Sequence, residues 1–163
     1  MLLGIISDTH EGLEQIETAK KLFVSRGVET IIHLGDYCAG PSVRAFKGGP
    51  KLIGIFGNND GDHTSIQRNF GAVGGEFKGH FCVLEYNGLK IACYHGTISD
   101  ITEALILCGK YDVVLYGHTH ASLIEKRGKV LVVNPGSSHG FEEGPPSVAI
   151  LDTKTREAEI VRL

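Results

Sequence analysis

The sequence lacks an excess of basic residues. Its 163 residues include 16 Lys and Arg against 19 Asp and Glu, which gives a net charge of −3. Nucleic acids and anionic membranes attract proteins mainly through clustered Lys and Arg side chains. The charge therefore argues against a polymeric nucleic acid or a membrane as the partner. An anionic substrate would need a local source of positive charge, such as a metal ion.

Long apolar runs are also missing. The N-terminal stretch MLLGIISDTH has no basic segment, and its apolar run stops at Ser7, so we expect neither a signal peptide nor a membrane span. Linkers, repeats and low-complexity segments are absent from the sequence as well. A content of 42% hydrophobic and 21% charged residues is typical of a soluble globular protein. We therefore expect residues 1–163 to form one cytoplasmic domain.

The four cysteines lack the CxxC spacing of a redox or metal motif. Two of them, Cys82 and Cys93, lie in apolar runs that resemble strands, and the others are Cys38 and Cys108. We interpret all four as small buried hydrophobic residues of a protein in a reducing cytoplasm. A disulfide or a thiolate metal site is the alternative.

The first half of the chain alternates strands with helices. Apolar runs predict buried strands over residues 2–7, 28–36 and 51–57. Apolar residues at helical spacing, or short helix-compatible runs, predict helices over residues 11–26, 42–47 and 64–70. Strands that alternate with helices are typical of a parallel sheet.

The second half is rich in hairpin signals. Asn87-Gly88 favours a type I′ turn between strands over residues 80–86 and 89–95, and Arg127-Gly128 marks a second turn inside residues 122–134. Further strands are expected over residues 111–117, 147–152 and 157–163. Hairpins imply antiparallel strands.

One further helix is expected over residues 99–110, with Ser99 or Asp100 as its N-cap and Gly109 at its end. Together these elements predict one α/β domain with mixed sheets. Two stacked β-sheets flanked by helices would accommodate this number of strands.

Polar residues follow five of the predicted strands, usually just after a glycine. In α/β sheets, ligands bind at the carboxyl ends of the strands. Taken alone, Asp8 would fit a helix cap and Asp36 a turn, but the joint pattern favours a metal site. This edge would present two carboxylates, four imidazoles and an amide oxygen, from Asp8, His10, Asp36, Asn58, His95, His118 and His120.

Seven donors are more than one ion needs, because four-coordinate zinc takes four. With one carboxylate shared, they form two adjacent sites, an arrangement that clamps the attacking and leaving oxygens of a phosphoryl displacement. A hydroxide that bridges the two ions would be the nucleophile, and the local positive charge would attract a phosphate ester. Nitrogen and oxygen donors suit Mn²⁺, Ni²⁺, Fe²⁺ or Zn²⁺.

The ordered motifs resemble those of the calcineurin-like metallophosphoesterases, and especially their small single-domain phosphodiesterase branch. The resemblance implies a four-layer αββα sandwich of two mixed β-sheets flanked by helices. It also implies a metal-dependent hydrolase that acts on phosphoric esters. The motifs are Asp8-x-His10, Gly35-Asp36, Gly57-Asn58-Asn59-Asp60, His95-Gly96, Gly117-His118-Thr119-His120 and Asn134-Pro135-Gly136-Ser137.

Matched position by position, the resemblance implies two ions that share Asp36. One ion would be held by Asp8, His10, Asp36 and His120. The other would be held by Asp36, Asn58, His95 and His118.

Asn59 stands where the family has a histidine that acts as a general acid or a phosphate contact. An amide donates a hydrogen bond but cannot deliver a proton to an alkoxide. We predict that Asn59 is a catalytic residue that contacts the phosphate, and that diesters with good leaving groups are preferred. Alternatively, a metal-bound water or a loop histidine such as His63 supplies the proton. The role of Asp60 stays open.

The remaining histidines have other expected roles. His33 lies within an apolar strand, so we expect an interior or supporting residue rather than a ligand. Glycine-rich loops hold His63 and His139, which could border the site, whereas His80 is expected at the surface. The segment 71–79 could gate the site or mediate association into a homo-oligomer.

Two other functions stay open beside hydrolysis of a small phosphodiester. One is a non-catalytic interaction scaffold, like the retromer subunit that shares this fold but has lost ligands; here all seven ligand positions are filled. The other is a nuclease, against which the negative net charge argues.

Overall fold

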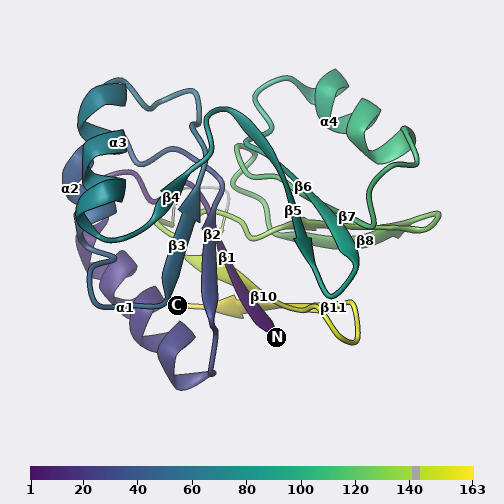
Figure 1. The fold of residues 1–163 in the computed structure, drawn as a ribbon, viewed down its shortest axis with the longest axis horizontal. Helices are drawn as coiled ribbons and strands as arrows, with labels where there is room; N and C mark the ends of the chain where they lie inside the picture. Colours follow the sequence, from purple (N-terminus) through teal and green to yellow (C-terminus); the bar gives the residue numbers. More distant parts are fainter. Residues whose placement is uncertain (141–143) are drawn as a thin grey trace.

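The computed structural model describes residues 1–140 and 144–163. Two β-sheets lie face to face, and helices cover their outer sides (Figure 1). The predicted α/β fold with two mixed sheets is therefore confirmed.

The first sheet has the strand order β11-β10-β1-β2-β3-β4. Its strands are β1 (Leu2–Ile6), β2 (Thr30–His33), β3 (Lys51–Gly54), β4 (Glu76–Phe77), β10 (Ser147–Asp152) and β11 (Glu157–Arg162). β1, β2 and β3 are parallel, as their alternation with helices predicts. The short strand β4 extends this parallel set and was not expected from the sequence.

The second sheet has the order β5-β6-β7-β9-β8. Its strands are β5 (Phe81–Tyr86), β6 (Leu89–Tyr94), β7 (Val113–Leu115), β8 (Leu123–Arg127) and β9 (Val130–Asn134). Both expected hairpins form, and the positive φ angles of Asn87 (51°) and Gly88 (78°) fit the predicted type I′ turn. The hairpin pairs β5–β6 and β8–β9 are antiparallel, as expected. The sheet is mixed, however, because β6, β7 and β9 pair in parallel, which the hairpin signals did not predict. The crossover through α4 (Ser99–Leu107) makes β6 and β7 parallel, and the connection through the outer strand β8 makes β7 and β9 parallel, because each returns the chain to the same end of the sheet.

In the described part of the chain, four helices flank the sheets: α1 (Leu13–Ser25), α2 (Gly40–Arg44), α3 (His63–Ala72) and α4 (Ser99–Leu107). Figure 1 shows α1, α2 and α3 beside the first sheet and α4 beside the second. Helix α2 starts earlier than predicted, because Pro41 is accommodated in its first turn. The predicted cap of α4 was wrong: Ile98 is the N-cap and no side chain caps the helix. Asp100 lies in its first turn, where a carboxylate favours the helix dipole.

Apolar side chains form three layers between these elements. One core lies between the two sheets and includes Ile5, Ile32 and Val133. A second core joins the first sheet to α1, α2 and α3, and a third joins the second sheet to α4. This is the four-layer sandwich that the family resemblance implies. Within residues 1–140 and 144–163, every helix is too short or too polar to cross a lipid bilayer.

The cysteines differ in their burial. All four thiols are free; Cys93 is buried, Cys38 and Cys82 are half-buried, and Cys108 is exposed. The expectation of a buried residue is therefore confirmed for Cys93 and wrong for Cys108, which follows the last turn of α4 on its solvent side.

Gly54 in β3 tests the packing between the first sheet and α3. A Cβ atom at this position would overlap the Tyr37 hydroxyl and the Phe70 ring. We expect Gly54→Ala to lower the free energy of unfolding by about 1–3 kcal/mol, because overpacking strains a filled core. Urea unfolding followed by circular dichroism measures the change.

The matched control is Gly61→Ala, since nothing lies within 4 Å of a Cβ atom at Gly61. This variant should unfold at the same urea concentration as the parent or slightly above it. Equal stability of the two variants would contradict the packing argument.

Candidate metal centre

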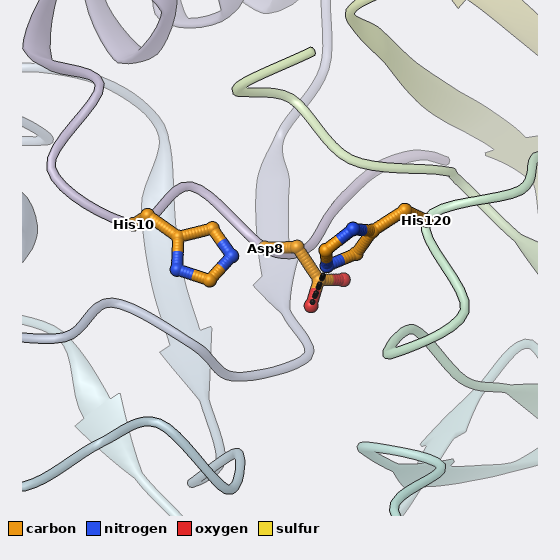
Figure 2. Close-up of side chains that lie close together, drawn as sticks. All are labelled: Asp8, His10 and His120. Atoms are coloured by element: carbon orange, nitrogen blue, oxygen red, sulfur yellow. Dashed lines mark ion pairs between the residues drawn. The ribbon is translucent and has the colours of Figure 1, made fainter. Parts of the chain in front are cut away.

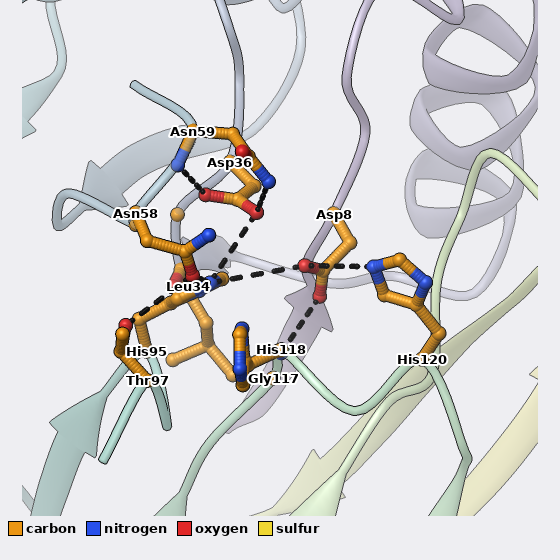
Figure 3. A network of polar contacts seen from close by, with 12 residues as sticks. Asp8, Leu34, Asp36, Asn58, Asn59, His95, Thr97, Gly117, His118 and His120 are labelled. Carbon is orange, nitrogen blue, oxygen red and sulfur yellow. Dashed lines mark hydrogen bonds and ion pairs between the residues drawn. The ribbon is translucent and has the colours of Figure 1, made fainter. Parts of the chain in front are cut away.

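The seven predicted donors lie at one edge of the molecule, where the carboxyl ends of strands from both sheets meet. Asp8 and His10 follow β1, Asp36 follows β2 and Asn58 follows β3 in the first sheet. The second sheet supplies the others, because His95 follows β6 and both His118 and His120 follow β7. Figure 3 shows six of these side chains around one point, and Figure 2 adds His10.

The backbone at this edge has strained φ angles, which are common at functional sites. Most of the candidate donors occupy the left-handed region, which costs a residue other than glycine about 1–3 kcal/mol. Two backbone hydrogen bonds, from Asp8 N to Gly35 O (3.1 Å) and from His10 N to Asp36 O (2.9 Å), continue the β1–β2 pairing past the strand ends and hold these turns. The candidate donors with positive φ are Asp8 (53°), His10 (44°), Asp36 (62°), His118 (66°) and His120 (57°).

A first group of donors consists of Asp8, His10 and His120 (Figure 2). One ligand atom of each lies within 4.8 Å of the others, and the Nε2 atom of His120 lies 3.4 Å from Asp8 Oδ1. The Nδ1 atom of the His10 ring lies 3.2 Å from the sulfur of Cys38. A proton on Nδ1 that is donated to this sulfur leaves the lone pair of Nε2 for a metal ion.

A second group consists of Asp8, Asp36 and His95 (Figure 3). The Nδ1 atom of His95 lies 2.8 Å from the carbonyl oxygen of Leu34, so Nδ1 is protonated and donates a hydrogen bond to this oxygen. The other nitrogen, Nε2, faces three oxygens: Asn58 Oδ1 at 3.0 Å, Asp36 Oδ2 at 3.4 Å and Asp8 Oδ1 at 3.9 Å.

Such a cluster of acceptors requires a cation. Without a metal ion, a proton on His95 fills this need: burial lowers the pKa of His95, but Asp36 and Asp8 outweigh burial and raise it. Asp8 is fully buried, and among the described residues its Oδ1 atom has no hydrogen-bond donor. A buried carboxylate oxygen without a donor is costly unless it binds a cation. The donor set therefore fits divalent ions.

Asp8 belongs to both groups, whereas the family resemblance implies Asp36 as the shared ligand. His118 lies beside the second group, with its ring centroid 5.3 Å from that of His95. Its backbone N–H donates to Asp8 Oδ2 (3.1 Å). The structure thus brings all seven residues together, and their division between two ions stays a prediction.

Asn59 holds Asp36 rather than standing free at the edge of the site. Its backbone N–H donates to Asp36 Oδ1 and its side-chain Nδ2 donates to Asp36 Oδ2, both at 2.8 Å. Burial would raise the pKa of Asp36, but the hydrogen bonds from His95 and Asn59 outweigh burial and hold this pKa well below its usual range. Asn59 therefore orients an ionised carboxylate; its contact with a phosphate stays a prediction.

Asp60, whose role the sequence left open, ties two ligand loops together. Its buried carboxylate accepts four backbone N–H groups, from the turns that follow β2 and β3. Gly57 lets these loops approach, because a Cβ atom there would overlap Asp36. The donors are Asp36 (3.0 Å), Tyr37 (2.6 Å), Cys38 (2.9 Å) and Gly57 (2.7 Å).

His33 is an interior supporting residue, as expected. It is fully buried, stacks on the Tyr37 ring at 3.8 Å, and accepts the Gly35 N–H at Nδ1 (3.1 Å). Its proton is therefore on Nε2, which donates to the hydroxyl of Thr9 (3.0 Å). Burial lowers the pKa of His33 well below its usual value and keeps the ring neutral. Sequence reasoning missed Thr9, although it is the middle residue of the Asp8-x-His10 motif.

The other histidines have different neighbours. His139 borders it, with its ring centroid 6.1 Å from that of His10. His63 instead stacks on Phe56 at 3.8 Å, and His80 lies at the same aromatic ring, 5.1 Å away. His80 is exposed, as expected.

The chain belongs to the calcineurin-like phosphoesterase superfamily, because the model of this family's domain matches residues 1–156. Phosphodiesterase MJ0936 of Methanocaldococcus jannaschii is 37% identical over 159 residues, which are 96% of each chain. The solved structure of an archaeal phosphodiesterase aligns with a TM-score of 0.95 at 36% identity over 100% of both chains.

A more distant solved structure shares the fold alone. Vps29 of Chaetomium thermophilum aligns with a TM-score of 0.74 at 16% identity, over 99% of this chain and 93% of that one.

The Thr9 hydroxyl offers a test of how the ligand loop after β1 is held. Thr9→Val keeps the shape of the side chain but leaves the buried Nε2–H of His33 without an acceptor. We expect Mn²⁺ affinity to fall by about 10- to 100-fold, as for other partners of metal ligands. Competition with a fluorescent chelator measures the affinity.

Thr9→Ser retains the hydroxyl and is the matched control, with an affinity within about threefold of the parent protein. If Thr9→Val bound Mn²⁺ as tightly as Thr9→Ser, the hydroxyl would have no part in holding the loop.

Proposed function

We propose that this chain is a phosphodiesterase that hydrolyses small phosphodiesters with the help of two divalent metal ions. One observation carries the proposal: two adjoining donor groups share the buried carboxylate of Asp8. Adjacent cation sites of this kind suit an in-line displacement at phosphorus. The names of the similar phosphodiesterases support the substrate class.

The seven candidate ligands form two sets, one for each proposed ion. Asp8, His10, Asp36 and His120 would hold the first ion, and Asp36, Asn58, His95 and His118 would hold the second, so that Asp36 is shared; Asp8, which belongs to both donor groups, would lie next to both ions. Two divalent ions held by these residues would supply positive charge for the phosphoryl oxygens and would lower the pKa of a bound water towards ~7, which would provide a hydroxide nucleophile at neutral pH. The oxygen and nitrogen donors suit Mn²⁺, Ni²⁺, Fe²⁺ or Zn²⁺.

The supporting residues keep this arrangement ready before substrate binds. Asn59 fixes both oxygens of Asp36, and Asp60 fixes the turn that carries Asp36. Preformed geometry avoids reorganisation during the reaction, which is a main source of catalysis in polar sites.

Hydrolysis of an aryl phosphodiester by chelator-treated protein, with and without added Mn²⁺ or Ni²⁺, tests the proposal. We expect turnover only with metal, and slower turnover of the matching aryl phosphomonoester. His120→Ala should lose more than about 100-fold in kcat/KM, because even partners of metal ligands change affinity by 10- to 100-fold.

His80→Ala is the matched control, since His80 is an exposed histidine that belongs to neither donor group. No metal-dependent turnover of either ester would contradict the enzyme and favour a scaffold of the same fold. A steep loss of activity with salt on a polymeric substrate would favour a nuclease, because the salt dependence reports phosphate contacts.

Asn59 provides a test of the proton supply. Asn59→His places a possible proton donor beside Asp36, so we expect alkyl diesters to gain more than aryl diesters, whose leaving groups need no proton. The ratio of kcat/KM for the two substrates measures this preference.

Asn59→Ala serves as the comparison, because it removes the side-chain bond to Asp36 but adds no donor. Both substrates should then slow together, by about 10-fold or more. An unchanged substrate ratio in Asn59→His would show that the missing histidine does not limit the reaction.

A further inference from the structure

Two cysteines lie opposite each other in the second sheet, apart from the donor groups of the metal centre. Cys82 on β5 is paired with Cys93 on β6 in the antiparallel register. Residues in direct register have Cα atoms about 4.5–5.5 Å apart, and a disulfide needs about 4.4–6.8 Å. Both side chains pack on the core between the two sheets, so they are on the same face. The backbone thus already has the spacing of a disulfide.

The two thiols differ in their access to solvent. Cys93 is fully buried, whereas Cys82 is half-buried on β5, the edge strand of the sheet. The adjacent Cys93 thiol and the ammonium group of Lys78 lower the pKa of Cys82 against the opposing effect of burial. An edge strand has a partner on one side only, so β5 can move the short distance that a sulfur–sulfur bond requires.

We propose that Cys82 and Cys93 form a reversible disulfide in the presence of a small-molecule disulfide. The Cys82 thiolate attacks one sulfur of the oxidant, which forms a mixed disulfide and releases one thiolate. The Cys93 sulfur then attacks Cys82, gives up its proton and releases the second thiolate. Two protein thiols are oxidised and one small-molecule disulfide is reduced to two thiols.

The other cysteines are not placed for this reaction. The sulfur of Cys38 contacts the ring of His10, and burial, together with Asp36, raises the pKa of the Cys38 thiol to about 11. Cys108 is exposed after α4 and donates to the Leu105 carbonyl.

The bond would connect the edge strand to a strand that leads into the metal centre. Cys93 precedes the candidate ligand His95 by two residues on the same chain segment. A disulfide there fastens β5 to β6 and reduces the opening of the edge, which amide hydrogen exchange of β5 detects.

Oxidised glutathione is the probe that tests the proposal. The full-length Cys108→Ser variant removes the exposed thiol and leaves three others. After incubation with oxidised glutathione, we expect thiol titration in denaturant to give one thiol in place of three. Peptide mass spectrometry should identify a Cys82–Cys93 link, and dithiothreitol should restore all three thiols.

Two further variants in the same background separate the steps. With Cys93→Ser or Cys93→Ala, Cys82 should keep a stable glutathione adduct; with Cys82→Ser, the buried Cys93 should stay reduced. The proposal is overturned if the Cys108→Ser protein, with both cysteines present, retains three thiols or keeps glutathione on Cys82. The readout uses no catalysis, so it does not depend on the proposed function.

Discussion

Buried acceptor oxygens that require a cation are the constraint on which the rest of the site depends. Asp8 is fully buried with an oxygen that has no hydrogen-bond donor among the described residues. Asp8 also faces His95 across a space that Asp36 and Asn58 border with further oxygens. Such a cluster is unfavourable in an apolar interior. The fold tolerates it because a cation, whether a proton on His95 or a metal ion, neutralises these groups.

The surrounding structure maintains an arrangement that the backbone alone would not adopt. Five candidate ligands have positive φ angles, and strain of this size persists only where neighbouring groups fix each residue. Here Asp60 gathers four backbone donors, and the pair Thr9 and His33 connects the loops after β1 and β2. The free energy of packing the three apolar layers therefore offsets the backbone strain at the edge that carries the candidate ligands.

Much of the fold and the identity of the donors could be predicted from the sequence, because both depend on local patterns. The amino-acid sequence alone shows which strand ends are followed by Asp, Asn or His, and it shows the turn residues Asn87-Gly88. The parallel pairing of β6, β7 and β9 could not be predicted, since it depends on where a crossover returns the chain. The contacts of Asn59, Asp60 and Thr9 were also hidden, because each joins segments far apart in the sequence.

The candidate ligands come from both sheets, and this origin links metal binding to folding. Asp8, Asp36 and Asn58 extend from the first sheet, whereas His95 and His120 extend from the second. An ion at this edge would bridge the two sheets, whose apolar faces form the central core. A ligand bound only by the folded state at 100 times its Kd adds about 2.7 kcal/mol to stability. With the proposed ions, the concentration of free metal would be a variable of the folding equilibrium, and the separation of the two sheets would be the motion that metal binding opposes.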